Sequence, residues 1–390
     1  MDNKSGEFFR NARRSGLWLD TDAIHRSTLT KAREKVHWKV FEDILSDAVD
    51  VAYDLWPQST DYLWHGMSVY AIDGSKHTLP ATDEIRKEFD PESGLQYSGK
   101  GHYPQCLVST AYDVFRRLPV ARTVVSANAS EREEAEKLIP HIPIGNVILF
   151  DRGYPGYGFI KYLKENYSGY FLFRCPASST FPAVERFAKS GKEEGIIWID
   201  PSDKYLSKID KKDRNKLNPI KIRVIKLCSP DGTVSVLLTN LFDKKEFSRS
   251  NIISLYFRRW EVESYYRDEK TVLEVERFHC KTCSSIRQEL FAVVIMSVIT
   301  RTLMVLSSEL SDSEAIEPQF KNAIMTFASE AAVLVPDNPE KAIEIFKEIL
   351  DEISRVKYYR HKVRRPSQPR VCKRPLNKWA TAKSKKIANA

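Results

Sequence analysis

Two short apolar runs that each end in an aspartate constrain this chain more than any other feature. Residues 68–74 (SVYAIDG) contain Asp73, and residues 145–153 (GNVILFDRG) contain Asp151. Short apolar runs bounded by glycine and turn-forming residues are typical of buried strands. We therefore expect two buried strands that each carry an acid at the carboxyl end.

The segments around these runs alternate between strand-like and helix-like patterns. Further strands are predicted over 105–114, 118–126 and 169–175, and helices over 131–139 and 158–166. The first two of these strands are separated by three residues, which predicts an antiparallel hairpin. Three leading strands followed by helix and strand in alternation indicate a mixed α/β sheet flanked by helices, the ribonuclease-H-like pattern. In such a sheet the strands of Asp73 and Asp151 are neighbours, so the two acids can converge.

Residues 177–247 interrupt this alternation with short β-like pieces over 195–199, 221–227 and 234–238. We interpret the segment as a β-rich insertion before the last helix of the sheet domain. Lysines and arginines crowd residues 211–226. Two interpretations of these charges remain open: a basic face available to DNA, or an exposed sheet edge protected by lysine.

A third acid comes from a long helix predicted over 252–273. Polar residues on it follow one another in steps of three and four, namely Tyr256, Arg259, Glu263, Tyr266 and Lys270. Residues at this spacing share one face of a helix. A face that packs on a core would be apolar, so this one is either functional or a row of solvated surface ion pairs.

The same helix carries a family signature. Residues 256–270 (YFRRWEVESYYRDEK) fit the pattern Y-x2-R-x3-E-x6-K at every spacing. With residues 72–74 (IDG), 150–153 (FDRG) and 237–241 (LLTNL), the chain resembles the insertion-sequence-4-type transposases of the DDE superfamily. The resemblance covers roughly residues 65–310.

The resemblance implies a ribonuclease-H-like catalytic core and names the residues of its site. Asp73, Asp151 and Glu263 would hold two Mg²⁺ ions, with Mn²⁺ able to substitute. Tyr256, Arg259 and Lys270 would contact DNA at the transposon end, with Arg152 and Tyr266 as further phosphate contacts. We expect Trp260 to pack in the core. Carboxylates suit these ions because Mg²⁺ prefers oxygen ligands and keeps several waters.

The implied reaction is hydrolytic nicking of transposon-end DNA, followed by attack of the freed 3′-hydroxyl on target DNA. The implied partners are double-stranded DNA, as terminal inverted repeats and as target, and a second copy of the chain in a synaptic complex. Two alternatives stay open: a metal-dependent nuclease without strand transfer, and a transposase-derived DNA-binding protein that has lost catalysis. An RNA-processing hydrolase fits the fold but not the signature helix.

We expect four regions along the chain. They are an N-terminal helical region over 1–65 that contacts DNA or covers the core, a catalytic domain over 66–310, a helical region over 311–352 and a basic tail over 353–390. The tail has 13 lysines and arginines and no acid, against a net charge of +9 for the whole chain. Such a segment is typical of polyanion binding, although a solvated solubility tail is also consistent with it.

No targeting or membrane segment is expected. The apolar run over 290–300 is shorter than the roughly 18–20 residues that span a bilayer, so it predicts a buried helix over 286–306. The first residues lack the apolar stretch of a secretory signal. Together with the resemblance to bacterial transposases, these features lead us to expect a bacterial cytoplasmic protein associated with the nucleoid.

Overall fold

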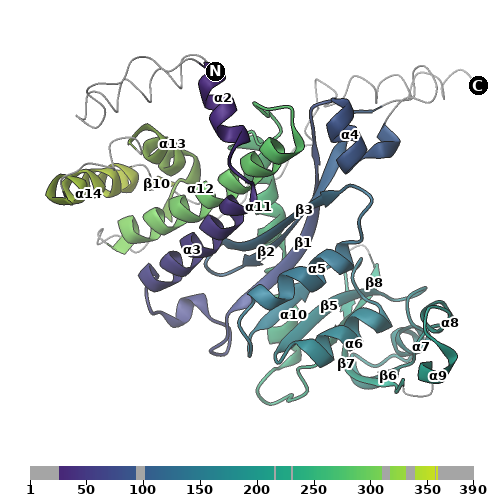
Figure 1. Ribbon diagram of the computed structural model, residues 1–390. Helices are drawn as coiled ribbons and strands as arrows, with labels where there is room; N and C mark the ends of the chain where they lie inside the picture. The colour runs from purple at the N-terminus through teal and green to yellow at the C-terminus, as the bar shows by residue number, and fades with distance from the viewer. Residues whose placement is uncertain are drawn as a thin grey trace, which may run out of the picture.

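One mixed sheet of eight strands forms the centre of the computed structural model (Figure 1). The structure describes residues 26–93, 102–214, 217–229, 232–309, 317–330, 339–355 and 357–358. The strands are β1 (Val69–Thr78), β2 (Gln105–Asp113), β3 (Leu118–Ser126), β4 (Val147–Phe150), β5 (Tyr170–Pro176), β6 (Glu194–Ile199), β7 (Ile220–Cys228) and β8 (Val234–Thr239). Their order across the sheet is β3-β2-β1-β4-β5-β8-β7-β6.

The first five strands have the predicted ribonuclease-H-like arrangement. Strands β1, β2 and β3 form an antiparallel meander, and β4 and β5 lie parallel to β1. The predicted hairpin is the β2–β3 pair, whose turn contains Arg117 at a φ of 57°. The expectation of a mixed sheet flanked by helices is thus confirmed.

The β-like pieces of residues 177–247 join the same sheet. Strand β8 pairs with β5 in antiparallel fashion, from Leu172 opposite Thr239 to Pro176 opposite Ser235, and β7 and β6 continue beyond it. Strand β6 forms this edge and exposes Trp198 to 56%. The inserted strands therefore widen the central sheet.

Helices cover both faces of the sheet (Figure 1). Those of the N-terminal and central parts are α2 (Arg26–Glu34), α3 (Lys39–Leu55), α4 (Asp83–Phe89), α5 (Glu131–Leu138), α6 (Tyr157–Asn166), α7 (Pro182–Lys189), α8 (Asp203–Leu206) and α9 (Lys211–Arg214). Those that follow are α10 (Arg249–Phe257), α11 (Trp260–Thr271), α12 (Cys283–Glu309), α13 (Phe320–Glu330) and α14 (Pro339–Arg355). A two-stranded ribbon joins β9 (Glu317–Pro318) to β10 (Lys357–Tyr358).

The side chains of β1 show how the layers are arranged. Asp73 lies beside Arg259 at the start of α11, whereas the next residue, Gly74, faces Glu131 of α5. Because successive residues of a strand point to opposite faces, α11 and α5 cover opposite faces of β1. The active-site candidates therefore approach β1 from the α11 side.

Helix α12 is the long apolar helix that the sequence predicts. It is the helix, among the described residues, that is long and apolar enough to cross a membrane, and 61% of its most apolar window is buried inside the protein. Its side chains reach both the main core and a smaller cluster with α13 and α14 that includes Leu303, Ile349 and Ile353. A helix buried on most sides becomes apolar all round, which explains its composition.

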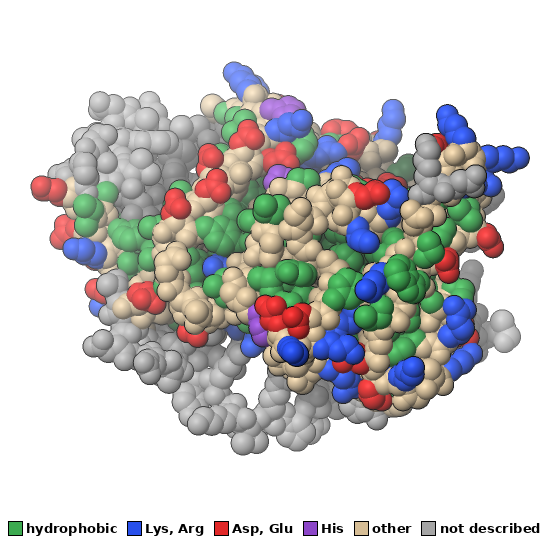
Figure 2. All heavy atoms as spheres, turned by 90° about the horizontal axis from the view of Figure 1, so that it is seen from below, with side chains coloured by type: hydrophobic (Ala, Val, Ile, Leu, Met, Phe, Trp, Pro, Cys, Tyr) green, Lys and Arg blue, Asp and Glu red, His purple; other side chains and the backbone are tan. Residues whose placement is uncertain are grey.

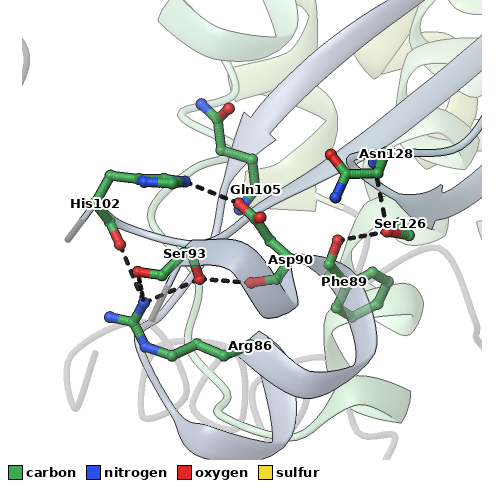
Figure 3. A network of polar contacts seen from close by, with 8 residues as sticks. All are labelled: Arg86, Phe89, Asp90, Ser93, His102, Gln105, Ser126 and Asn128. Atoms are coloured by element: carbon green, nitrogen blue, oxygen red, sulfur yellow. Dashed lines mark hydrogen bonds and ion pairs between the residues drawn. The ribbon is translucent and has the colours of Figure 1, made fainter. Parts of the chain in front are cut away.

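The connection between β1 and β2 is held by a polar network beyond the end of α4 (Figure 3). Arg86 Nη1 donates to the Ser93 carbonyl at 2.8 Å and to the His102 carbonyl at 3.1 Å. Asp90 Oδ2 accepts from the Gln105 backbone N–H at 3.1 Å and lies 3.2 Å from His102 Nε2. These contacts fix the chain on both sides of residues 94–101 and place the start of β2 against β1.

Two predicted boundaries were wrong. Strand β1 does not end at Asp73 but continues to Thr78, paired with β2 alone over its second half. The helix predicted over 252–273 is two helices, α10 and α11. Residues 1–25 and most of the tail over 353–390 lie outside the described residues, so the predictions for them stay predictions.

Candidate active site

Strand register brings Asp73 and Asp151 to the same place. The parallel pairing of β1 with β4 ends at Ile72 opposite Phe150. Asp73 and Asp151 each follow the last paired residue of their strand, so the two residues lie side by side where the pairing ends. Beyond this point β4 has ended while β1 continues along β2. The sheet is therefore open on the β4 side where the two acids lie.

A tight turn between α10 and α11 aims the signature residues at this opening. The N–H groups of Arg258, Arg259, Glu261 and Val262 each donate to the carbonyl three residues earlier, at 2.9–3.2 Å. Hydrogen bonds of this spacing make a short 3₁₀ segment. The segment contains no proline or glycine, which explains why the sequence pattern predicts a single helix.

Arg259 lies among the acids. Its side chain is 4% exposed, its Nη2 donates to Glu263 Oε1 at 2.5 Å, and its Nη1 lies 3.7 Å from Asp73 Oδ2. Burial alone would lower the pKa of Arg259, but Tyr256, Glu263, Asp151 and Asp73 together hold that pKa above its usual value. One guanidinium therefore pairs with Asp73 and Glu263, and Asp151 acts on it electrostatically.

The carboxyl of Asp73 is hard to ionise. Burial raises its pKa to about 7, and Asp151 and Glu263 add to the rise, while Arg259 and the backbone N–H of Gly74 oppose it. Neighbouring carboxylates raise one another's pKa because each disfavours the charge of the other. The raised pKa of Asp73 is therefore a consequence of burial first and of the neighbouring acids second.

The donor set suits a divalent cation, although it is not arranged as a finished cage. Three carboxylates around one buried positive group have the oxygen chemistry that Mg²⁺ and Mn²⁺ prefer. Among the residues that the structure describes, no three His, Cys, Asp or Glu side chains lie close enough to hold a metal ion as they stand. Arg259 lies between Asp73 and Glu263, in the space that a metal ion shared by these two carboxylates would occupy.

Two residues of the signature face bind the backbone of the sheet. Tyr266 is 5% exposed, and its hydroxyl donates to the Asp73 carbonyl at 2.8 Å. Lys270 Nζ donates to the Lys76 carbonyl at 2.7 Å. Both contacts fasten α11 along β1, so they set the position of Glu263 relative to Asp73.

The remaining predicted DNA contacts differ in exposure. Tyr256 is 1% exposed, and burial raises its pKa to about 12, with Asp151 adding to the rise. Arg152 is exposed and directly follows Asp151. The structure therefore presents Arg152 at the surface of the site and keeps Tyr256 beneath it.

The expectation that Trp260 packs in the core was wrong. Trp260 is 52% exposed and its neighbour Phe257 is 51% exposed. The guanidinium of Arg259 lies 5.5 Å from the Trp260 ring centroid. The tight turn directs this side chain outward, so two large aromatic residues flank the acids at the surface.

Sequence reasoning missed two residues next to the site, Tyr154 and Glu131. The Tyr154 hydroxyl is buried, forms no hydrogen bond with any described residue, and has its pKa raised by burial and then by Asp73 and Glu131. The Glu131 carboxyl carbon lies 3.2 Å from where a Cβ on Gly74 would be. Gly74 thus leaves room for a fourth carboxylate. A glycine directly after Asp73 was the one sequence feature that could have indicated this close approach.

A buried ion pair behind the site was also missed. Arg122 of β3 donates from Nη2 to Glu269 Oε1 at 2.5 Å and to the Tyr265 hydroxyl at 3.0 Å, and from Nη1 to the Leu290 carbonyl at 3.0 Å. Arg122 and Glu269 side chains are both fully buried. The pair ties α11 and α12 to β3 and thereby orients the helix that carries Glu263.

Most of the sheet domain matches a known protein family. The family model described as "Transposase DDE domain" matches residues 64–299, which is more than half of the chain. The chain belongs to this family. The match spans β1, β4 and α11, and therefore all three acids of the candidate site.

Two curated transposases are similar in sequence. The transposase InsG for insertion sequence element IS4 of Escherichia coli (strain K12) is 25% identical over 259 residues, which cover 65% of this chain and 56% of that protein. The putative transposase y4zB of Sinorhizobium fredii (strain NBRC 101917 / NGR234) is 28% identical over 191 residues, 49% of this chain and 51% of that protein. The chain is thus similar to a transposase of element IS4, and it spans about half the length of the curated relatives it matches.

A solved structure is similar in fold. The piggyBac transposase in a synaptic complex with hairpin DNA matches with a TM-score of 0.42 and 9% sequence identity, over 77% of this chain and 59% of that one.

Proposed function

We propose that this transposase cleaves the DNA at the ends of an insertion sequence and joins the freed 3′-hydroxyl to target DNA. The observation that carries the proposal is the convergence of Asp73 and Glu263 on Arg259 near the end of β4, which Asp151 directly follows. These acids come from two strands and a helix far apart in sequence. A structural role does not require carboxylates from a strand and a distant helix to share one buried cation, and taking that cation out of water is costly.

Asp73, Asp151 and Glu263 are the residues that would hold two divalent ions, Mg²⁺ or Mn²⁺. Such ions activate the attacking oxygen of a phosphodiester reaction and stabilise the leaving one. Asp73 has to lose its proton to become a ligand, and its raised pKa makes this loss sensitive to pH near neutrality. Arg259 has to withdraw from the acids.

The basic side chains around the acids would then bind DNA phosphates. Arg259 would exchange its carboxylate partners for a phosphate, which its planar fork can bind with two hydrogen bonds. Arg152 is exposed beside Asp151, and Lys270 lies where α11 meets β1. Tyr256 and Tyr266 are buried, so we assign them to positioning Arg259 and α11 in addition to any contact with end DNA.

The proposed partners are terminal inverted repeats, target DNA and a second copy of the chain in a synaptic complex. We propose the division into residues 1–65, 66–310, 311–352 and 353–390 as the corresponding working units, with the basic tail available to DNA. The setting would be the bacterial cytoplasm at the nucleoid.

Two alternatives remain, a nuclease without strand transfer and a DNA-binding protein without catalysis. The second is disfavoured because a protein that only binds DNA gains nothing from keeping three acids beside one buried arginine.

A cleavage and strand-transfer assay tests the proposal. The purified chain is incubated with Mg²⁺ or Mn²⁺, a duplex carrying the terminal repeats of the element, and a plasmid target. Glu263→Gln is the test variant. Glu261→Gln is the matched control, because Glu261 is two residues away on the same helix and lies 3.7 Å from Arg117.

The proposal is supported if the wild type and Glu261→Gln both join 3′ ends to the plasmid. Glu263→Gln should bind the DNA without cutting it. Cutting without joining favours the nuclease. Binding without cutting in either metal favours the non-catalytic protein.

A further inference from the structure

An apolar groove of about 380 Å³ lies between α3, α12 and α14, away from the acids. Its lining includes Ile44, Val51 and Leu55 of α3, Ile299 and Leu306 of α12, and Phe346 of α14. Three of these side chains are large and exposed: Ile44 to 44%, Val51 to 55% and Leu55 to 49%. Neighbouring exposed aliphatic residues on one helix mark a surface that has a partner.

The groove is bordered by negative charge. Helix α3 carries five acids and one lysine. Asp43, Asp47, Asp50 and Asp54 are exposed, and none of them forms an ion pair with another described residue. Figure 2 shows hydrophobic side chains beside acidic ones on the left of the molecule, the side on which Figure 1 places α3, α12 and α14. The occupant should therefore be apolar and positively charged.

The N-terminal segment of the chain has this composition. Residues 8–19 (FFRNARRSGLWL) contain Phe8, Phe9, Leu17, Trp18 and Leu19 together with three arginines, and no acid. The segment lies outside the described residues. Its large apolar side chains match the apolar lining, and its arginines match the unpaired aspartates of α3.

The segment can reach the groove. It precedes α2, which is held on α12 by Arg33 Nη1 donating to Glu289 at 3.1 Å and by Gln288 Nε2 donating to the Arg33 carbonyl at 3.0 Å. From Glu289 to Ile299, α12 advances by roughly 15 Å. The six residues between Leu19 and α2 span up to about 20 Å when extended. Arg33 lies near the carboxyl end of α2, so Arg26, where α2 begins, can be up to roughly 10 Å farther from the groove than this contact. The six residues together with the first few residues of the segment itself, counted back from Leu19, are long enough to cover this distance when extended.

The basic C-terminal tail fits less well. Its charge is also positive, but its large apolar residues, such as Val371, Leu376 and Trp379, are spread over a longer stretch and interrupted by prolines. The exposed lining of the groove is almost wholly apolar, so it favours a segment whose large apolar residues lie close together. Burial of apolar area supplies most of the free energy of docking, and exposed ion pairs add little.

We propose that residues 8–19 dock into the groove between α3, α12 and α14 of their own chain. The aromatic and leucine side chains fill the groove, and the arginines face the aspartates along α3. The proposal is independent of DNA cleavage, since neither the segment nor the groove includes a residue of the candidate active site.

A photo-crosslinking experiment on the full chain tests the docking. A benzophenone amino acid replaces Trp18, and the crosslinked peptides are identified by mass spectrometry. We expect crosslinks within one chain to residues 44–55 and 295–306. Val51→Asp should lower their yield by about tenfold or more, because burying an unpaired charge costs more than the ~1.4 kcal/mol that this factor represents.

Ile144→Asp is the matched control. Ile144 is 75% exposed, does not line the groove, and should leave the crosslinks unchanged. Circular dichroism checks that both variants fold. Crosslinks to the groove of a second chain, crosslinks elsewhere, or a yield that Val51→Asp does not change would each overturn the proposal. The first of these results would assign the groove to a second copy.

Discussion

Arg259 donates to Glu263 across 2.5 Å and lies 3.7 Å from Asp73, so one buried arginine occupies the space between two proposed metal ligands. The sequence predicts Arg259 and Glu263 on one face of a helix, and the family resemblance assigns Arg259 to DNA. The structure shows that this side chain has a second set of partners. An arginine that neutralises the acids before metal binds must compete with the metal for them.

Replacing Arg259 should therefore change metal binding and DNA binding in opposite directions. In Arg259→Gln without DNA, we expect tighter Mn²⁺ binding, by about tenfold if the lost competition amounts to ~1.4 kcal/mol. Binding to end DNA should weaken. Isothermal titration calorimetry with Mn²⁺ measures the first effect and gel shift the second. Arg258→Gln is the control, because Arg258 stacks on Phe115 at 5.4 Å and does not contact the acids. Unchanged or weaker Mn²⁺ binding would contradict competition.

Metal binding should also weaken as the pH falls through about 7. The pKa of Asp73 is raised to about 7, and only the ionised carboxylate can serve as a ligand. Without metal, the free energy of unfolding should change with pH in the opposite direction. Between about pH 4 and 7 the folded chain retains a proton that the unfolded chain has lost, so stability should fall as the pH rises. Calorimetry with Mn²⁺ and urea unfolding across this range measure the two effects. Asp73→Asn should remove the part of each pH dependence that comes from Asp73. If metal affinity and stability change with pH equally in the variant and the wild type, Asp73 is not the titrating group.

A methyl group at position 74 should disturb the α5 side of the site. A Cβ there would lie 3.1 Å from Leu107 Cδ1 and 3.2 Å from the Glu131 carboxyl carbon. We expect Gly74→Ala to lower the free energy of unfolding by about 1 kcal/mol, at the lower end of overpacking costs because Glu131 can move. Urea unfolding provides the measurement. Gly153→Ala serves as the control, since nothing lies within 4 Å of its added Cβ. Equal stabilities of the two variants would show that the contact at Gly74 relaxes freely.

The buried pair of Arg122 and Glu269 predicts a large effect on stability. Glu269→Leu leaves the guanidinium without its ion partner in the core and should cost ~3–5 kcal/mol. Arg122→Met combined with Glu269→Leu should recover much of this loss, since replacing both partners by apolar residues removes the unpaired charge. Glu165→Ala, which breaks the partly exposed pair with Lys161, should cost less than ~1 kcal/mol. A double variant as unstable as the single one would show that the pair itself supplies the stability.

The sequence predicted the neighbouring strands of Asp73 and Asp151 because their buried halves are continuous apolar runs. It missed the rest of β1, residues 74–78, because this half pairs with β2 alone and its side chains need not be apolar. The sequence also did not predict that β8 pairs with β5. Pairing between distant strands depends on tertiary packing, which a local pattern does not record.

The sequence indicated which three acids belong to the candidate site, but it did not indicate most of the residues that they contact. Glu263 follows Arg259 by four residues, and this spacing alone indicates an ion pair on one helix turn. The contact of Arg259 with Asp73 requires the 3₁₀ turn at residues 258–262, for which the sequence has no marker residue. Glu131, Tyr154 and the buried pair of Arg122 and Glu269 belong to segments that looked like ordinary helix, turn and strand.

The spread of the three acids along the chain has a consequence during translation. A nascent polypeptide that has left the ribosome as far as β8 already has both aspartates and every strand of the sheet, but it lacks Arg259 and Glu263. Its two aspartates then face each other without the arginine that neutralises them. Incomplete products of synthesis therefore lack the acid that we propose completes the DNA-cutting centre, and that centre can form only after α11 has emerged and docked along β1.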